Sequence, residues 1–274
     1  MDNILEKAKD AKDYIESKIN IKPKIAIILG SGLGKLADDV CDRVEISYAE
    51  IPHFPVSTVK GQAGKLVIGS ISGKEVIVMS GRFHYYEGYS MEEVTFPIRV
   101  FSLLGIEKLI VTNAAGGVAR DSEPGDIMII KDHIKLSSVS PLMGPNIEEF
   151  GTRFPDMLNA YDKEMIVTAK EVAHKLDIRV KEGVYFYMAG PQYETVAEVN
   201  MIRILGGDSV GMSTVPEVIA CAHSGIKVLG ISCITDVLKP DTVSVTHEEV
   251  VEVANRVSDN LCRLVTGILE DVED

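Results

Sequence analysis

The chain has 274 residues, of which 46% are hydrophobic and 25% are charged, with 23 glycines and 11 prolines. This composition is typical of a globular protein and excludes collagen-like and low-complexity chains. The formal net charge is −13 at pH 7, which argues against nucleic-acid binding, because that requires basic side chains to neutralise phosphates. We expect one domain spanning residues 1–274.

The sequence carries no pattern for export, membrane insertion or metal binding. Its first ten residues are charged where a signal peptide needs an apolar stretch, and no run of 18 apolar residues occurs. The cysteines form no Cys-x-x-Cys pair and have no histidine at zinc-ligand spacing: Cys41, Cys221, Cys233 and Cys262. We therefore expect a reduced, cytoplasmic protein with no metal and no membrane partner.

Apolar spacing predicts the elements in chain order. Ile4, Ala8, Ala11 and Ile15 recur at helical steps and predict an amphipathic helix over residues 1–20. Residues 24–29 then form an apolar, β-branched run that ends at a glycine, which is typical of a buried strand. Further strands are expected at 65–71, 75–79, 109–112, 126–130, 184–188 and 227–232, the first two joined as a hairpin.

Helical patterns alternate with these strands. They cover residues 91–104, 158–176, 195–205, 215–223 and 246–268. The last begins with Thr246 and has Glu249 three residues later, which is a capping-box pattern. Alternating strands and helices predict an α/β fold, with one central mixed, largely parallel sheet flanked by helices.

Polar and glycine-rich segments follow six of the apolar runs. Ligands of α/β sheets bind beyond the carboxyl ends of the strands, so these segments should line one composite pocket. They are residues 30–34, 80–84, 112–117, 189–194, 211–214 and 232–236.

One half of this pocket has the side chains that suit a phosphate. Arg82 offers a planar fork of donors and His84, two residues on, can face the same side. With Ser31, Ser213 and the amides near Ala114, they resemble a phosphate cradle. The glycine pattern at 30–34 matches neither a P-loop nor a dinucleotide fingerprint, so a plain tight turn is the alternative there. A surface ion pair is the alternative for the arginine.

The other half suits a ring system and a sugar. Four apolar side chains could pack there or belong to the ordinary core: Tyr86, Phe154, Tyr193 and Met212. Glu194 and Asp236 are carboxylates at the ends of apolar runs, so they need donors, which a heterocycle with N–H groups would supply. His247 begins the last helix, where it could equally be an exposed first-turn residue.

Five motifs resemble those of the trimeric purine nucleoside phosphorylases, in the family's order and spacing. They are Gly-Ser-Gly-Leu-Gly at 30–34, Gly-Arg-Phe-His-Tyr-Tyr-Glu-Gly-Tyr at 81–89, Thr-Asn-Ala-Ala-Gly-Gly at 112–117, Ala-Gly-Pro-Gln-Tyr-Glu-Thr at 189–195 and Val-Gly-Met-Ser-Thr-Val-Pro-Glu at 210–217. The resemblance implies that family's fold and a homotrimer. It also implies reversible phosphorolysis of purine (2′-deoxy)ribonucleosides to the base and (deoxy)ribose 1-phosphate. Phosphate is then a co-substrate, and no cofactor is needed.

The resemblance also implies a role for each site residue. The phosphate contacts would be Ser31, Arg82, His84, the amide of Ala114 and Ser213. The ribose contacts would be Tyr86, Met212 and His247, and the purine contacts Tyr193, Glu194 and Asp236, with Phe154 lent by a neighbouring subunit. Glu87 would orient His84, and the catalytic residues would be His84, Glu87 and Asp236.

Two positions depart from the family's pattern. Members selective for 6-oxopurines usually carry Asn where this chain has Asp236, and many have His where it has Gln62. An ionised carboxylate cannot donate a hydrogen bond. Asp236 would therefore either hold a proton and donate to the purine N7, or accept from a 6-amino group. Both alternatives widen the substrate range from 6-oxopurine to 6-aminopurine nucleosides.

Three other functions compete with this one. A methylthioadenosine or methylthioinosine phosphorylase has the same fold and also uses Asp at that strand end. A nucleotide-dependent oxidoreductase is suggested only by the glycine-rich turn, and the acidic residue at the required distance, Glu50, lies in an expected loop. A non-catalytic nucleoside-binding protein would not need the phosphate cradle.

Overall fold

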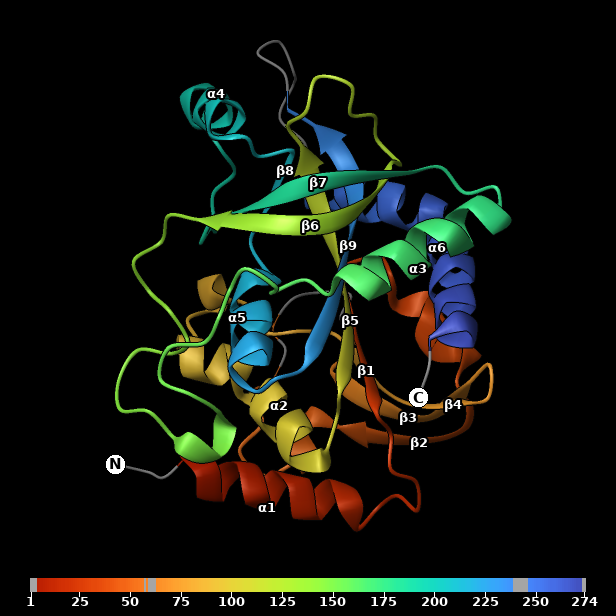
Figure 1. The fold of residues 1–274 in the computed structure, drawn as a ribbon, viewed down its shortest axis with the longest axis vertical. Helices are drawn as coiled ribbons and strands as arrows, with labels where there is room; N and C mark the ends of the chain where they lie inside the picture. The colour runs from red at the N-terminus through yellow and green to blue at the C-terminus, as the bar shows by residue number, and fades with distance from the viewer. Residues whose placement is uncertain (1–3, 57, 59–62, 239–245, 273–274) are drawn as a thin grey trace.

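The computed structural model describes residues 4–56, 58, 63–238 and 246–272, without the side chain of His247. Nine strands form one sheet in the order β2-β3-β4-β1-β5-β8-β7-β6-β9 (Figure 1). Because β9 also pairs with β5, five of the strands close into a ring. The strands are β1 (Ile25–Leu29), β2 (Cys41–Ser47), β3 (Lys65–Ile71), β4 (Lys74–Ser80), β5 (Lys108–Gly117), β6 (Ile127–Lys135), β7 (Val180–Tyr187), β8 (Ser209–Gly211) and β9 (Lys227–Val237).

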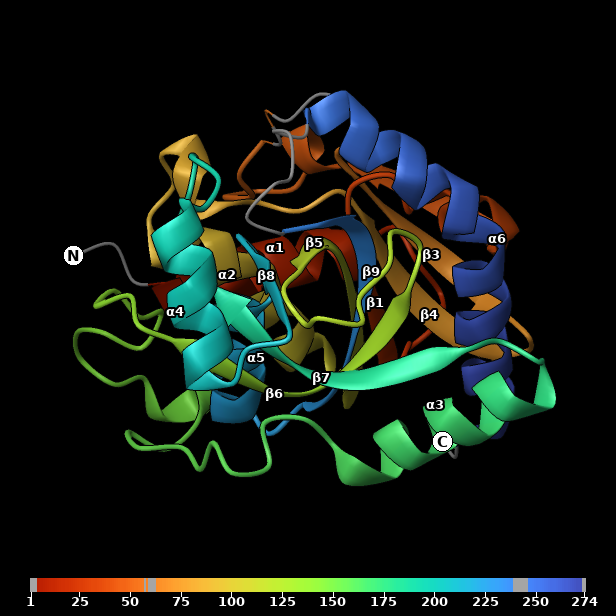
Figure 2. The ribbon, with the colours of Figure 1, turned by 90° about the horizontal axis from the view of Figure 1, so that it is seen from above.

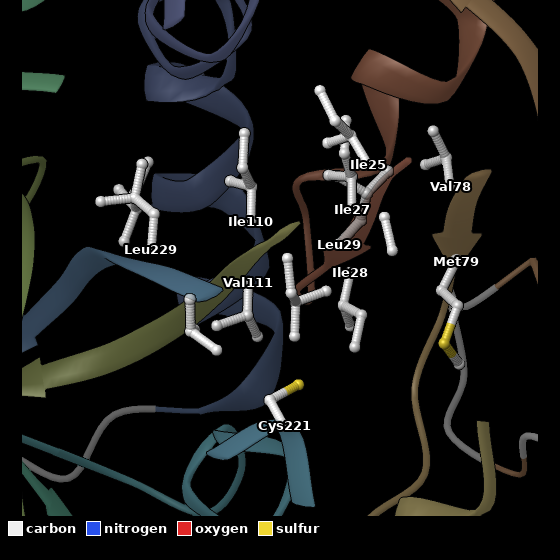
Figure 3. Packing of buried hydrophobic residues seen from close by; sticks show 14 of the residues in the cluster. Ile25, Ile27, Ile28, Leu29, Val78, Met79, Ile110, Val111, Cys221 and Leu229 are labelled. Atoms are coloured by element: carbon white, nitrogen blue, oxygen red, sulfur yellow. The ribbon is translucent and has the colours of Figure 1, made fainter. Parts of the chain in front are cut away.

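Four neighbouring strands, β4, β1, β5 and β9, run parallel to one another. Their carboxyl ends therefore meet at one edge of the sheet. Their centres are buried on both faces, as apolar β-branched runs of this kind require. Ile27, Ile110 and Leu229 lie in this core (Figure 3).

The helices flank the sheet in two groups (Figures 1 and 2). The first group is α1 (Ile4–Glu16), α2 (Met91–Leu104) and α5 (Val215–His223), which pack in series. The second is α3 (Lys163–Lys175) and α6 (His247–Asp271), and α4 (Val196–Leu205) lies apart at the periphery. The hairpin of β3 and β4 and the capping box of Thr246 with Glu249 are both present, as the sequence predicts. No helix among the described residues has the length and apolar composition of a membrane span.

The structure corrects several expected boundaries. The sequence analysis missed β2, an edge strand whose side chains are mostly exposed, and β8, which has only three residues. The helix expected from residue 158 starts at Lys163, because Asp162 caps it. Four of the nine strand pairings are antiparallel, so the mixed sheet is less parallel than predicted.

Candidate active site

All six polar segments line one cavity at the carboxyl edge of the sheet, as the sequence predicts. Its empty volume, counted with the space that is open to solvent, is about 710 Å³. The wall includes Ser31, Arg82, His84, Tyr86, Ala114, Tyr193, Glu194, Met212, Ser213 and Asp236. The ends of β1, β4, β5, β8 and β9 and the segment after β7 each contribute to it.

Arg82 lies at the base of this cavity, where its side chain is only 2% exposed. Its Nε donates to Glu217 Oε1 at 3.1 Å. Its Nη1 donates to the Thr112 carbonyl at 2.8 Å and to Ser213 Oγ at 3.1 Å. The guanidinium is therefore fixed from three elements, β5, α5 and the turn before α5, which is the rigidity that an anion-binding group needs.

The first glycine-rich turn is shaped by its neighbours. Thr112 Oγ1 accepts a hydrogen bond from the Gly30 amide at 3.0 Å and so holds the start of the turn to β5. Gly32 has φ of +73°, and a Cβ added there would lie 2.6 Å from the Ala254 Cβ. Both features favour glycine, and they present Ser31 to the cavity.

His84 is held by the carboxylate of Glu87. The Glu87 Oε1 lies 2.9 Å from the imidazole Nδ1 and accepts from the His84 backbone amide at 2.8 Å. Burial raises the pKa of Glu87, but hydrogen bonds from His84 and Thr58 outweigh it and lower the pKa to about 2. An ionised Glu87 makes Nδ1 the donor and leaves Nε2 for a ligand. Tyr86 stacks on the imidazole with ring centroids 4.7 Å apart.

A second part of the cavity wall carries two carboxyl groups, those of Glu194 and Asp236. Burial raises the pKa of Glu194, and the nearby charge of Asp236 adds to that rise. Burial also raises the pKa of Asp236, although a hydrogen bond from Thr235 at 3.0 Å opposes it. Tyr193 lies beside them and is 52% exposed. This wall therefore favours a ligand that brings donors to the carboxyls and a flat face to the tyrosine.

One residue singled out from the sequence, Phe154, lies away from the cavity, and two others cannot be placed relative to it. Phe154 is 85% exposed and belongs to a separate surface hollow with Met143 and Met157. Gln62 and the side chain of His247 lie outside the described residues. No cluster of three potential metal ligands occurs in the part of the chain that the structure describes.

The sequence analysis gave no role to Glu217 or Thr112, although both support Arg82. Glu217 lies in the first turn of α5 and is only 3% exposed. The signal that could have found it is a carboxylate inside an otherwise apolar helix, Val-Pro-Glu-Val-Ile-Ala-Cys-Ala, because a buried carboxylate requires a partner.

The comparisons with known proteins agree with this geometry. The sequence pattern of the phosphorylase superfamily matches residues 24–270. Purine nucleoside phosphorylase 1 of Geobacillus stearothermophilus is 52% identical over 263 residues, which cover 96% of each chain. The Schistosoma mansoni purine nucleoside phosphorylase in complex with adenosine superposes with a TM-score of 0.94 at 43% identity, covering 98% of each chain. Its complex with inosine gives 0.94 at 42% identity and covers 98% and 97%.

Proposed function

The chain belongs to the phosphorylase superfamily, as an enzyme of purine nucleoside phosphorolysis, and from this premise we propose which residues bind the phosphate, the ribose and the purine. It converts a purine nucleoside and phosphate reversibly into the free base and pentose 1-phosphate. One observation supports these roles best: a guanidinium and two carboxyl groups line the same cavity.

The phosphate binds on the wall formed by Ser31, Arg82, His84, the Ala114 amide and Ser213. Cleavage of a glycosidic bond passes through an oxocarbenium-like state. A phosphate held below the sugar carbon stabilises that cation and then captures it. Glu87 keeps the imidazole oriented toward the anion. Fixed donors of this kind need no reorganisation during the reaction.

The purine binds against Tyr193, Glu194 and Asp236. Glu194 accepts a hydrogen bond from the base N1–H, and Asp236 forms hydrogen bonds on the N7 side of the base. As a protonated acid Asp236 donates to the leaving 6-oxopurine, and as a carboxylate it accepts from a 6-amino group. We therefore infer that both inosine and adenosine are substrates. The related Schistosoma mansoni enzyme has been crystallised with each of them, which supports this range.

Tyr86 and Met212 border the ribose, with His247 at its 5′-hydroxyl. Phe154, exposed as it is, completes the purine site of a neighbouring subunit in a homotrimer. Light scattering would test the trimer, and Phe154→Ala the shared site.

No metal or organic cofactor takes part, so activity survives EDTA. A cytoplasmic location is supported by the four free thiols.

The deciding experiment follows base release from inosine, guanosine, adenosine and methylthioadenosine, with and without phosphate. The raised pKa of Asp236 makes it a donor below that pKa and an acceptor above it. The ratio of adenosine to inosine turnover should therefore rise with pH. In Asp236→Asn the ratio should fall, because the amide always offers donors to the 6-oxopurine, and it should lose its pH dependence, because the amide does not titrate.

Different outcomes of this experiment would refute different parts of the proposal. Base release that does not depend on phosphate would refute phosphorolysis as the reaction. Turnover of inosine and guanosine with adenosine inert would refute the broad range alone. A preference for methylthioadenosine would favour the alternative enzyme, and Arg82→Ala with an unchanged phosphate KM would remove Arg82 from the phosphate site.

A further inference from the structure

We propose that Arg203, on α4, is a positioning residue that fixes the two carboxyl groups of the base wall, Glu194 and Asp236, relative to each other. The inference rests on the proposed role of these two residues in purine binding. Arg203 does not line the cavity, so it would act through the backbone segments that it joins.

Glu194 moves with α4, because it directly precedes the helix cap. Thr195 caps α4 by accepting from the Glu198 amide at 3.2 Å, and Glu198 accepts from the Thr195 amide at 2.7 Å. This reciprocal pair ties the start of the helix to the residue after Glu194. The position of the Glu194 carboxyl is therefore set by wherever α4 is held.

Asp236 moves with the end of β9, to which Arg203 is bonded. The Arg203 Nη2 donates to the carbonyl of Leu238, two residues after Asp236. Its Nε donates at 2.8 Å to the carbonyl of Val118, which directly follows β5. Leu238 in turn donates its amide to the Gly117 carbonyl at 2.9 Å. One guanidinium thus joins α4 to both strands that form this side of the cavity.

Little else among the described residues holds α4 in place. The helix buries only Val199 and Ile202, which belong to a small cluster separate from the main core. Val196 and Ile204 are 56% and 85% exposed, and Figure 1 shows α4 at the upper edge of the molecule. A helix with so little buried surface depends on hydrogen bonds to hold its position. The planar guanidinium of an arginine can donate to two carbonyls at once in a fixed geometry, whereas the ammonium of a lysine is a compact point charge.

Kinetics of Arg203→Ala test the proposal, with Arg203→Lys as a second variant. A misplacement of about 1 Å costs up to roughly 100-fold in rate, so kcat/KM for inosine should fall about 10- to 100-fold. The phosphate KM should stay within about twofold, because Ser31, Arg82, His84 and Ser213 lie on segments that Arg203 does not bond, and only the Ala114 amide belongs to a strand that it joins. The ratio of adenosine to inosine turnover should also change, and lysine should restore part of the loss.

Arg263→Ala is a matched control. Arg203 donates to Asn200, three residues earlier, at 3.3 Å, and Arg263 donates to Asn260 at the same spacing and distance. Arg263 also donates to a distant backbone carbonyl, that of Leu176 at 3.2 Å, but it does not line the cavity. It should behave as the wild type in every kinetic measurement.

A merely structural role gives a different pattern. It lowers the fraction of active enzyme, so that kcat falls alike for all substrates while the KM values and the ratio of adenosine to inosine turnover stay unchanged. That pattern would overturn the proposal. Kinetics of Arg203→Ala equal to those of Arg263→Ala would overturn it as well. If Arg203→Ala does not fold, Arg203→Lys decides on the same criteria. A wild type inactive on purine nucleosides would instead refute the proposed function.

Discussion

Replacing Glu217 with methionine should lower the free energy of unfolding by about 3–5 kcal/mol, because it leaves Arg82 as a buried cation without this carboxylate. The side chains of Arg82 and Glu217 are 2% and 4% exposed, and the Nε–Oε1 distance is 3.1 Å. Water therefore cannot solvate the Arg82 guanidinium once the Glu217 carboxylate has been removed. A change of this size corresponds to a fall in Tm of roughly 10 °C. The phosphate KM should rise as well, because Glu217 orients the guanidinium.

The double variant Arg82→Met, Glu217→Met separates charge pairing from ordinary packing. Because it removes both charges, it should be more stable than the sum of the two single variants predicts, by about 2 kcal/mol or more. It should still lack phosphate-dependent activity. Urea unfolding of the four proteins at pH 7 measures the coupling. Additive losses, or a Glu217→Met variant as stable as the wild type, would show that the pair contributes little.

Three further outcomes are expected. The lowered pKa of Glu87, about 2, stabilises the fold above the ordinary carboxyl pKa, and this is lost as pH falls toward 2. Glu87→Gln should therefore be less stable than the wild type in urea at pH 7 and approach it near pH 2, with a higher phosphate KM. Gly32→Ala should cost about 1–3 kcal/mol in thermal unfolding, since its φ is +73° and Ala254 blocks a Cβ. Chloride at about 0.5 M should change the phosphate KM less than about threefold, because carboxylates already balance the cations of that wall.

The sequence predicted the cavity better than it predicted the boundaries of the elements. Arg82 and Asp236 are charged residues at the ends of apolar runs, where an unpartnered charge would be costly in a hydrophobic core. Their position at the edge of the sheet could therefore be predicted from the sequence. The strands β5 and β9, by contrast, extend to Gly117 and Val237. The sequence analysis ended the two apolar runs at residues 112 and 232, because the pairing of the polar residues beyond them depends on neighbours distant in sequence.

Supporting residues were harder to recognise than those that face the cavity. Arg203 falls at an ordinary helical position, where a charged side chain usually indicates a solvated surface, and Glu217 was marked only by the apolar residues around it in α5. Only the tertiary structure shows that one of them is 3% exposed and that the other reaches two strand ends. Phe154 poses a different problem, because a residue proposed to act in a neighbouring subunit leaves no trace in its own chain's cavity.

The two walls of the cavity differ in how their charges are balanced. On the proposed phosphate wall, Arg82 and His84 each have a carboxylate within 3.1 Å, so recognition of an anion there would depend on the directions of donors more than on net charge. On the base wall, no cation among the described residues pairs with Glu194 or Asp236, and the pKa of each is raised by burial. The donors missing there are those that a purine brings. Binding of the base is therefore linked to protonation of that wall, and a change of pH should alter the nucleoside KM through Glu194 and Asp236.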